Sequence, residues 1–253
     1  MAELKVTRYA ATVTADGETL SITAVANLDR SFVRVTNNRF TTSGSSTATG
    51  NHEPDDLSVA VILTAVDTVT FRRPTVTPGR TAVMVDFEVV EYIGAVGGDH
   101  EFRVRSRNTV TLTSALTNTG TLTTSATDAD KCIPYINGIE SAEVSNKAQS
   151  LGAVAYLEST TTLRVNTAYS DAVVKRVYVE VVEYIGSAWT VYHGRLDGST
   201  ADNGSINLVT GSDGISGSAA NITDWANAWI DSWGHAGDAT NENIADLWPR
   251  WSP

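Results

Sequence analysis

The chain carries two copies of a hexapeptide that contains a carboxylate. The stretch VVEYIG occurs at Val89–Gly94 and again, 92 positions later, at Val181–Gly186. Each copy places a glutamate, Glu91 or Glu183, within a run of valines. Side chains alternate between the two faces of a strand, so each glutamate shares a face with apolar neighbours. A carboxylate in such a place needs a partner, because an unpaired buried charge costs several kcal/mol or forces protonation.

An arginine precedes each glutamate by nineteen residues, Arg72 in the first copy and Arg164 in the second. TVTFRRPT and TTTLRVNT, the segments around these arginines, align without a gap in the same frame as the hexapeptides. If each segment is the neighbouring strand, its guanidinium reaches the carboxylate in bidentate geometry. We therefore predict two structural ion pairs, Arg72–Glu91 and Arg164–Glu183. A bulge that turns each glutamate to solvent and a catalytic role are the two alternatives.

The sequence gives little support to catalysis. Glu88 and Glu91 face opposite sides of a regular strand, so they cannot flank one substrate bond as glycosidase carboxylates do. No HExxH, GxSxG, P-loop or GxGxxG motif opening a helix is present. The single cysteine, Cys132, lies in KCIPYI and is expected to be a buried small apolar side chain. We predict a protein that is not an enzyme and needs no cofactor.

Oxygen ligands for calcium are available in LDGSTADNGS, a turn-like segment in the second half of the chain. Asp197, Asp202 and Asn203 are the candidate ligands. Their spacing departs from the EF-hand pattern, and a solvated turn explains the composition better. We therefore predict no metal site.

Five of the six tryptophans follow residue 224. The first three recur at every fourth residue, which fits a short amphipathic helix over Asp224–Trp233. The segment also fits the opening of an incomplete third module. Clustered tryptophans can pack on their own chain, insert into a neighbouring subunit or stack on sugar rings. The interface or ligand candidates are Trp225, Trp229, Trp233, Trp248 and Trp251.

The elements that position these residues are short strand-like runs separated by turn-forming clusters, with no helical pattern between them. This rhythm predicts an all-β fold of tandem antiparallel β-sandwich modules, with a Trp-rich C-terminal extension or partial third module. The modules are expected at 1–100 and 101–200, followed by a linker and the Trp-rich segment at 201–253. The join between the modules is itself strand-like, so we expect them to abut. A polar, glycine-rich stretch at 41–56 is expected to be a surface loop.

Net charge and hydropathy exclude several classes of binding partner. The formal net charge is −11, which argues against binding to nucleic acid or to anionic membranes. No run of 18 apolar residues occurs, so no membrane insertion is expected. The first residues do not resemble a signal peptide, which predicts synthesis in the cytoplasm.

The order of motifs resembles a known group of repeats. An SFV strand (Ser31–Val33), then TVTFRR, then a strand of the type VYVEVVEY is similar to repeats of virion and tail-associated proteins of tailed bacteriophages and prophages. The resemblance implies a structural, non-enzymatic component of the virion, either a capsid decoration protein or a tail- or fibre-associated protein. It would be made in the host cytoplasm and would act as a homo-oligomer with other virion proteins.

The second module departs from this pattern, because CIPYI replaces the SFV type. If the Trp-rich segment opens a third repeat, we expect that repeat to lack its later strands, and a truncated module would leave apolar edges open. We therefore expect a neighbouring subunit to cover the C-terminal segment. The alternative function is an adhesion or carbohydrate-binding module that recognises a host-surface glycan through the Trp-rich end or the 41–56 loop.

Overall fold

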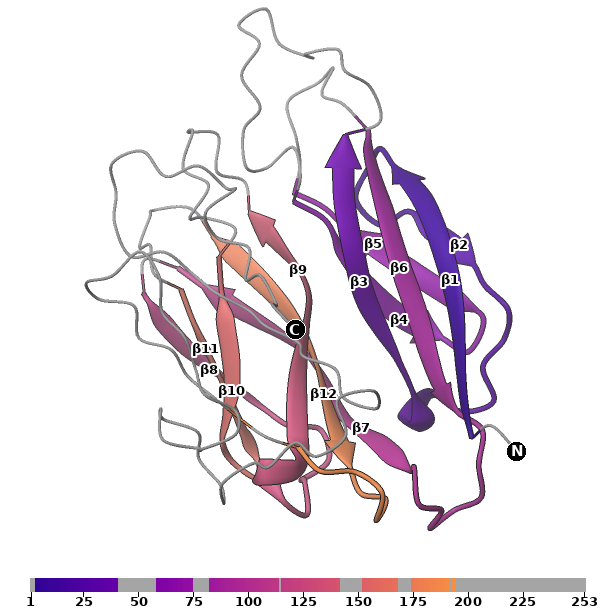
Figure 1. The fold of residues 1–253 in the computed structure, drawn as a ribbon. Coiled ribbons are helices and arrows are strands. Elements are labelled where there is room, and N and C mark those ends of the chain that lie inside the picture. Colours follow the sequence, from indigo (N-terminus) through magenta and orange to yellow (C-terminus); the bar gives the residue numbers. More distant parts are fainter. Residues whose placement is uncertain are drawn as a thin grey trace, which may run out of the picture.

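A computed structural model describes residues 3–40, 58–74, 82–113, 115–141, 152–167, 174–191 and 193. In this part of the chain the fold is all-β, with four antiparallel sheets of three strands each. The predicted fold class is therefore confirmed. Figure 1 shows the sheets paired into two sandwiches that lie side by side, drawn in indigo to magenta and in magenta to orange.

Among its described residues, the first sandwich, called module one, has six strands and one short 3-10 helix. One sheet has the order β1-β6-β3 and the other has the order β2-β5-β4. Alternating apolar side chains of the two sheets meet in a core that includes Val13, Val33, Val69, Phe71 and Phe87. The elements are β1 (Leu4–Val13), β2 (Thr19–Ser21), η1 (Leu28–Arg30), β3 (Ser31–Phe40), β4 (Ala60–Ala65), β5 (Thr68–Arg72) and β6 (Val83–Tyr92).

The second sandwich, called module two, repeats this topology. Its sheets have the orders β7-β12-β9 and β10-β11-β8. Cys132 belongs to its core, and burial raises the pKa of the thiol to about 12, which confirms the prediction of a buried apolar side chain. The elements are β7 (Phe102–Leu112), β8 (Thr117–Thr121), η3 (Ala129–Lys131), β9 (Cys132–Ser141), β10 (Val154–Ser159), β11 (Thr162–Asn166) and β12 (Lys175–Tyr184).

The VVEY strands, β6 and β12, are the central strands of their sheets. Both modules also carry a bulge at the same place in the edge strand, at Thr36 in β3 and at Asn137 in β9. The two central strands differ in burial. β6 alternates between buried and half-buried residues over most of its length, whereas nearly every residue of β12 is buried. Both faces of β12 are therefore covered.

Module one covers the face of β12 that points away from the core of module two. Strands β3 and β4 are the outermost strands of the two sheets of module one, and together they form one open edge of that sandwich. In Figure 1 this edge faces module two, and β1 lies on the far side. The edge contacts the outer face of the β7-β12-β9 sheet. The expectation that the modules abut is correct, and the contact joins an edge to a face.

The structural register corrects the ungapped alignment around the arginines. The turn before β5 is Val66–Asp67, and the turn before β11 is Thr160–Thr161. Pairing with the preceding strand aligns Thr68 with Thr162 and hence Arg72 with Asn166. The offset between the two copies that aligns the VVEY strands is therefore too short by two residues in this hairpin. Arg72 and Arg164 are not equivalent residues.

Among the described residues, no helix is long and apolar enough to cross a membrane.

Candidate functional site at the module interface

The predicted ion pairs of the VVEY glutamates are wrong. Arg72 lies on β5, in the sheet opposite the one that contains Glu91, and it lies 3.5 Å from Asp16 instead. Arg164 on β11 likewise pairs with Glu158. The reason is topological, because the neighbours of each VVEY strand are β1 and β3 or β7 and β9. The arginine-bearing strands lie across the core.

Both glutamates are nevertheless buried and paired, as their apolar surroundings predict. Glu91 accepts a hydrogen bond from the Ala26 backbone N–H at 2.5 Å and lies 3.2 Å from the Lys5 ammonium. Glu183 accepts from the Thr127 N–H at 2.9 Å. The Glu183 side chain is 0 % exposed and that of Glu91 is 4 % exposed, so the alternative of a bulge that turns them to solvent is also wrong.

The cationic partner of Glu183 is Arg105 on β7, at 2.5 Å. Lys5 on β1 occupies the corresponding strand of module one. Each carboxylate thus joins a cation of the neighbouring strand to the loop that enters a short 3-10 helix. Their role is to hold the loop in place, and no described contact directs them at a ligand.

A second pair of glutamates lies on the opposite face of the same strands, and its partners are not among the ion pairs predicted from the sequence. In β6, Glu88 Oε1 lies 2.9 Å from Arg8 Nε, and in β12, Glu180 Oε1 lies 2.6 Å from Arg107 Nε. In both modules the two residues are directly opposite in the antiparallel ladder. The signal in the sequence is the alternation of arginine in FRVRSRN, which places three guanidinium groups beside a strand rich in glutamate.

The Arg107–Glu180 pair caps the edge of module one. Glu180 Oε2 accepts from the Val33 backbone N–H of β3 at 2.7 Å. Arg107 Nη2 donates to the carbonyl oxygens of Leu28 at 2.9 Å and Ser31 at 2.6 Å. An open sheet edge presents unpaired N–H and C=O groups. The ion pair satisfies two such groups of β3, the Val33 N–H and the Ser31 carbonyl, and it also contacts the Leu28 carbonyl of η1. Because the carboxylate keeps a cation, the Val33 N–H and the side-chain amide of Asn137 as partners, its burial is compensated.

The segment that leads into the second edge strand, β4, is held against the backbone of β9. Ser58 Oγ donates to the Ile139 carbonyl at 2.5 Å and accepts from the Ser141 N–H at 2.7 Å. Beside them, Gly138 has φ +138°, and a Cβ at this position would overlap the Val59 carbonyl oxygen and the Ala60 Cα. Glycine at 138 therefore permits the two backbones to touch. Close backbone approach and positive φ are both conditions that favour glycine.

Aromatic side chains fill the rest of the interface. The ring of Phe32 from module one stacks on Tyr135 at 4.7 Å between centroids and meets Phe102 edge to face at 5.1 Å. Tyr92 lies 6.2 Å from Phe102. Phe32, Tyr92, Phe102, Val104, Tyr135, Val182 and Tyr184 form one cluster built from both modules. The interface thus has an apolar core of its own.

Charged groups surround this cluster. Burial alone would raise the pKa of Glu101, but the Gly97 N–H, the Arg103 guanidinium at 2.6 Å and the charge of Arg30 together lower it. Arg30 comes from module one and lies 3.4 Å from Glu101. Glu101 is therefore a carboxylate held in its ionised form at the module boundary.

Arg72 has a role at the interface, although it does not pair with Glu91. A hydrogen bond with the Tyr178 hydroxyl of module two is the largest cause that raises the pKa of Arg72. Tyr178 donates to Glu140 Oε2 at 2.6 Å. Burial and this carboxylate raise the pKa of Tyr178 to about 12. The tyrosine hydroxyl thus links a guanidinium of one module to a carboxylate of the other.

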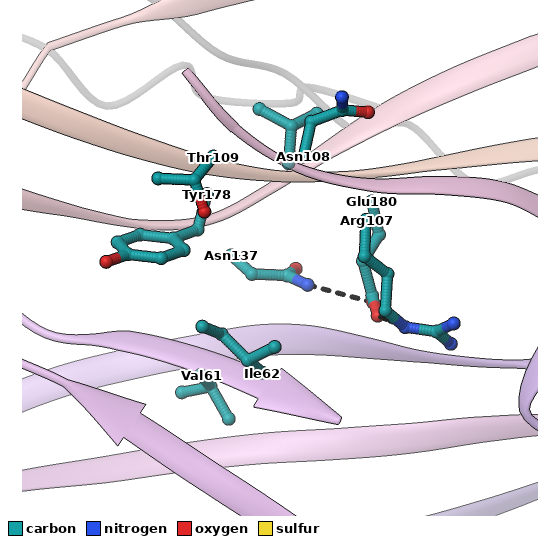
Figure 2. A pocket seen from close by; sticks show the side chains of 9 residues that line it. Val61, Ile62, Arg107, Asn108, Thr109, Asn137, Tyr178 and Glu180 are labelled. Carbon is teal, nitrogen blue, oxygen red and sulfur yellow. Dashed lines mark hydrogen bonds and ion pairs between the residues drawn. The ribbon is translucent and has the colours of Figure 1, made fainter. Parts of the chain in front are cut away.

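A small cavity remains between the modules. Figure 2 shows Val61 and Ile62 of β4 on one side, and Asn137 donating to Glu180 on the other. Its volume is about 40 Å³, which suits a water molecule and not an organic substrate. Among the described residues, Asn137 Oδ1 is buried without a hydrogen-bond partner. The remaining lining residues are Arg107, Asn108, Thr109, Tyr178 and Val179.

The other sequence candidates lie outside the described residues. These are the loop at 41–56, the calcium candidates Asp197, Asp202 and Asn203, and the five C-terminal tryptophans. Within the described ranges, no group of three or more His, Cys, Asp or Glu side chains is placed to hold a metal ion.

Comparison with protein-family models, with curated proteins and with solved structures gives no match for this chain.

Proposed function

We propose that the protein is a structural component of a tailed-phage virion, either a capsid decoration protein or a tail- or fibre-associated protein, that acts through subunit contacts and not through catalysis. The repeat pattern of SFV, TVTFRR and VVEY strands supports the virion assignment by resemblance. The geometry supports a mechanical role, because the most elaborate polar arrangement in the described chain joins its two modules.

The observation that carries the proposal is the buried Arg107–Glu180 cap. A guanidinium and a carboxylate from module two satisfy the N–H of Val33 and the carbonyl of Ser31 on the facing edge, and contact the carbonyl of Leu28 in the adjoining η1. Interdomain contacts are by default small, polar and mobile. This one instead combines an aromatic core, a backbone-to-backbone contact at Gly138 and a compensated ion pair. Such a junction makes two modules behave as one rigid unit, as a particle component requires.

The experiment is to purify particles from lysates of the host that encodes this chain, on a density gradient. Particle proteins are then quantified by mass spectrometry. We expect the chain to band with the particles, in a fixed ratio to the major capsid protein that is consistent with the symmetry of the particle. A chain that stays in the soluble fraction at the top of the gradient contradicts the proposal.

The competing function is tested with the same protein. Recombinant chain is applied to an array of bacterial surface polysaccharides. Monomeric protein that binds a glycan and is missing from particles favours the adhesion alternative.

A further inference from the structure

The contact between the modules joins unlike surfaces. Module one contributes an edge, formed by β3 and β4, and module two contributes a face, formed by the outer side of the β7-β12-β9 sheet. The chain also contains the complements of both. Module two has the equivalent edge, β9 and β10, and module one has the equivalent face, β1-β6-β3. Between two copies, these surfaces would form a head-to-tail contact, and such contacts generate open filaments when they do not close.

The central element of this contact is present on the module one face. Arg8 and Glu88 occupy the places of Arg107 and Glu180, with the same Nε to Oε1 pairing. The Glu88 side chain is 13 % exposed and that of Arg8 is 85 % exposed. A face that carries the capping pair is therefore available on the first module of every copy.

The edge of module two lacks the donor that this pair needs. The position equivalent to Val33 in β9 is Pro134, because Val33 lies opposite Val89 and Pro134 lies opposite Val181. Proline has no backbone N–H. Docking this edge on Glu88 would leave a carboxylate oxygen buried without the hydrogen bond that Glu180 receives from Val33. Proline on an edge strand is a common means of preventing edge-to-edge association.

The face of module one lacks the glycine that admits an edge. The position equivalent to Gly138 is Asn37, which follows the bulge in β3 as Gly138 follows the bulge in β9. At Gly138 no Cβ fits under the backbone of the docked strand. Asn37 has a side chain there, and its Nδ2 lies 3.4 Å from Asp86 Oδ2. Asp86 in turn replaces Tyr178, which contacts module one in the joined pair.

We propose that Pro134 and Asn37 together exclude head-to-tail association of this chain with itself, so that the edge-on-face contact forms once, within the chain. The partner being excluded is a second copy, through its β9 and β10 edge. The inference does not depend on whether the protein is part of a virion.

The test restores the missing features in the full-length chain. The variant N37G/P134V regains the glycine on the face and the N–H on the edge. By light scattering coupled to size exclusion, we expect its weight-average mass to rise at least about twofold over the wild type at about 100 μM and to keep rising with concentration. Adding E88A to this variant is expected to return the mass to the wild-type value, because it removes the acceptor.

Two outcomes overturn the proposal. One is a folded N37G/P134V variant with the wild-type mass at every concentration. The other is association that persists when E88A is added, since the contact would then use another surface. Folding is checked by thermal unfolding, and N37G/P134A, which also restores the N–H, replaces the valine variant if that variant does not fold.

Discussion

The two modules contain the same arginine–glutamate pair in two environments. Arg8 and Glu88 of module one lie on a face that contacts solvent, and the Arg8 side chain is 85 % exposed. Arg107 and Glu180 of module two lie under the edge of module one, with side chains 22 % and 3 % exposed. Both pairs join Nε to Oε1, so the identity of the two residues does not determine how much the pair contributes to stability. The covering edge does, because it removes water and adds three backbone partners.

The largest effect that this comparison predicts comes from truncating the buried carboxylate. Glu180→Ala leaves the partly buried Arg107 without its counter-charge and orphans the Val33 N–H. Breaking one partner of a buried pair costs about 3–5 kcal/mol. The matched change on the other module, Glu88→Ala, removes a surface pair worth about 0–1 kcal/mol. Equilibrium urea unfolding of both variants measures the difference. Equal losses of unfolding free energy in the two variants would show that the covering edge does not change the contribution of the pair to stability.

The next effect concerns the backbone contact at the interface. Gly138→Ala forces a Cβ into the Val59 carbonyl and also strains a residue with positive φ, so we expect a loss of about 3 kcal/mol or more. Gly97→Ala is the control, because Gly97 has φ +79° and no atom near its added Cβ. It should lose only about 1–2 kcal/mol from backbone strain. Thermal unfolding of the two variants separates the effect of the steric overlap with Val59 from the effect of backbone strain. Similar losses of stability in both variants would show that the overlap at Gly138 does not matter.

A smaller effect tests the partners of the repeated hexapeptide. A double-mutant cycle on Arg105 and Glu183, with Arg105→Ala and Glu183→Gln, should show a coupling of about 1–3 kcal/mol, because the two groups are in direct contact. The same cycle on Arg164 and Glu183 should be additive, since Arg164 pairs with Glu158. Urea unfolding of the single and double variants supplies the cycles. Coupling between Arg164 and Glu183 would restore the ion pair expected from the sequence.

The smallest effect is a pH dependence at the module boundary. The folded chain holds the pKa of Glu101 below its usual value. An acid with a lowered folded pKa stabilises the folded state above the unfolded pKa, about 4.3 for glutamate, and this contribution is lost as pH falls toward the lowered value. The slope of unfolding free energy against pH below about 5 should therefore decrease in Glu101→Gln. An unchanged slope in Glu101→Gln would contradict this role of Glu101.

Local patterns were sufficient for the strands. The runs TVTFR and VMVDFEVVEY alternate as strands with one buried face do, and both are strands, β5 and β6. The same alternation correctly placed Glu91 and Glu183 among buried residues, because facing is a local property with a period of two. The duplicated order of strands likewise predicted two sandwiches with a common topology, since each repeat must bury its own apolar faces.

Local patterns were not sufficient to predict which cation pairs with each buried glutamate. An arginine nineteen residues before a glutamate was expected to be its neighbour, but the hairpin β4-β5 lies in the opposite sheet. The ungapped alignment also slipped by two residues in this hairpin, because the turn positions differ between the copies. Spacing along a chain does not state which strands pair.

The sequence by itself determined the all-β class, the duplication, the positions of the strands in each repeat and the need to compensate two buried glutamates. These follow from side-chain alternation, which is set one strand at a time. Only the tertiary structure decided which cation meets which carboxylate, and only it decided that Glu180 is buried while its counterpart Glu88 stays half-buried. That decision rests on the β3 and β4 edge of module one lying on β12, a contact between segments far apart in the chain. VVEYIG is therefore a framework strand in both modules, and the tertiary contact gives the second copy its additional role.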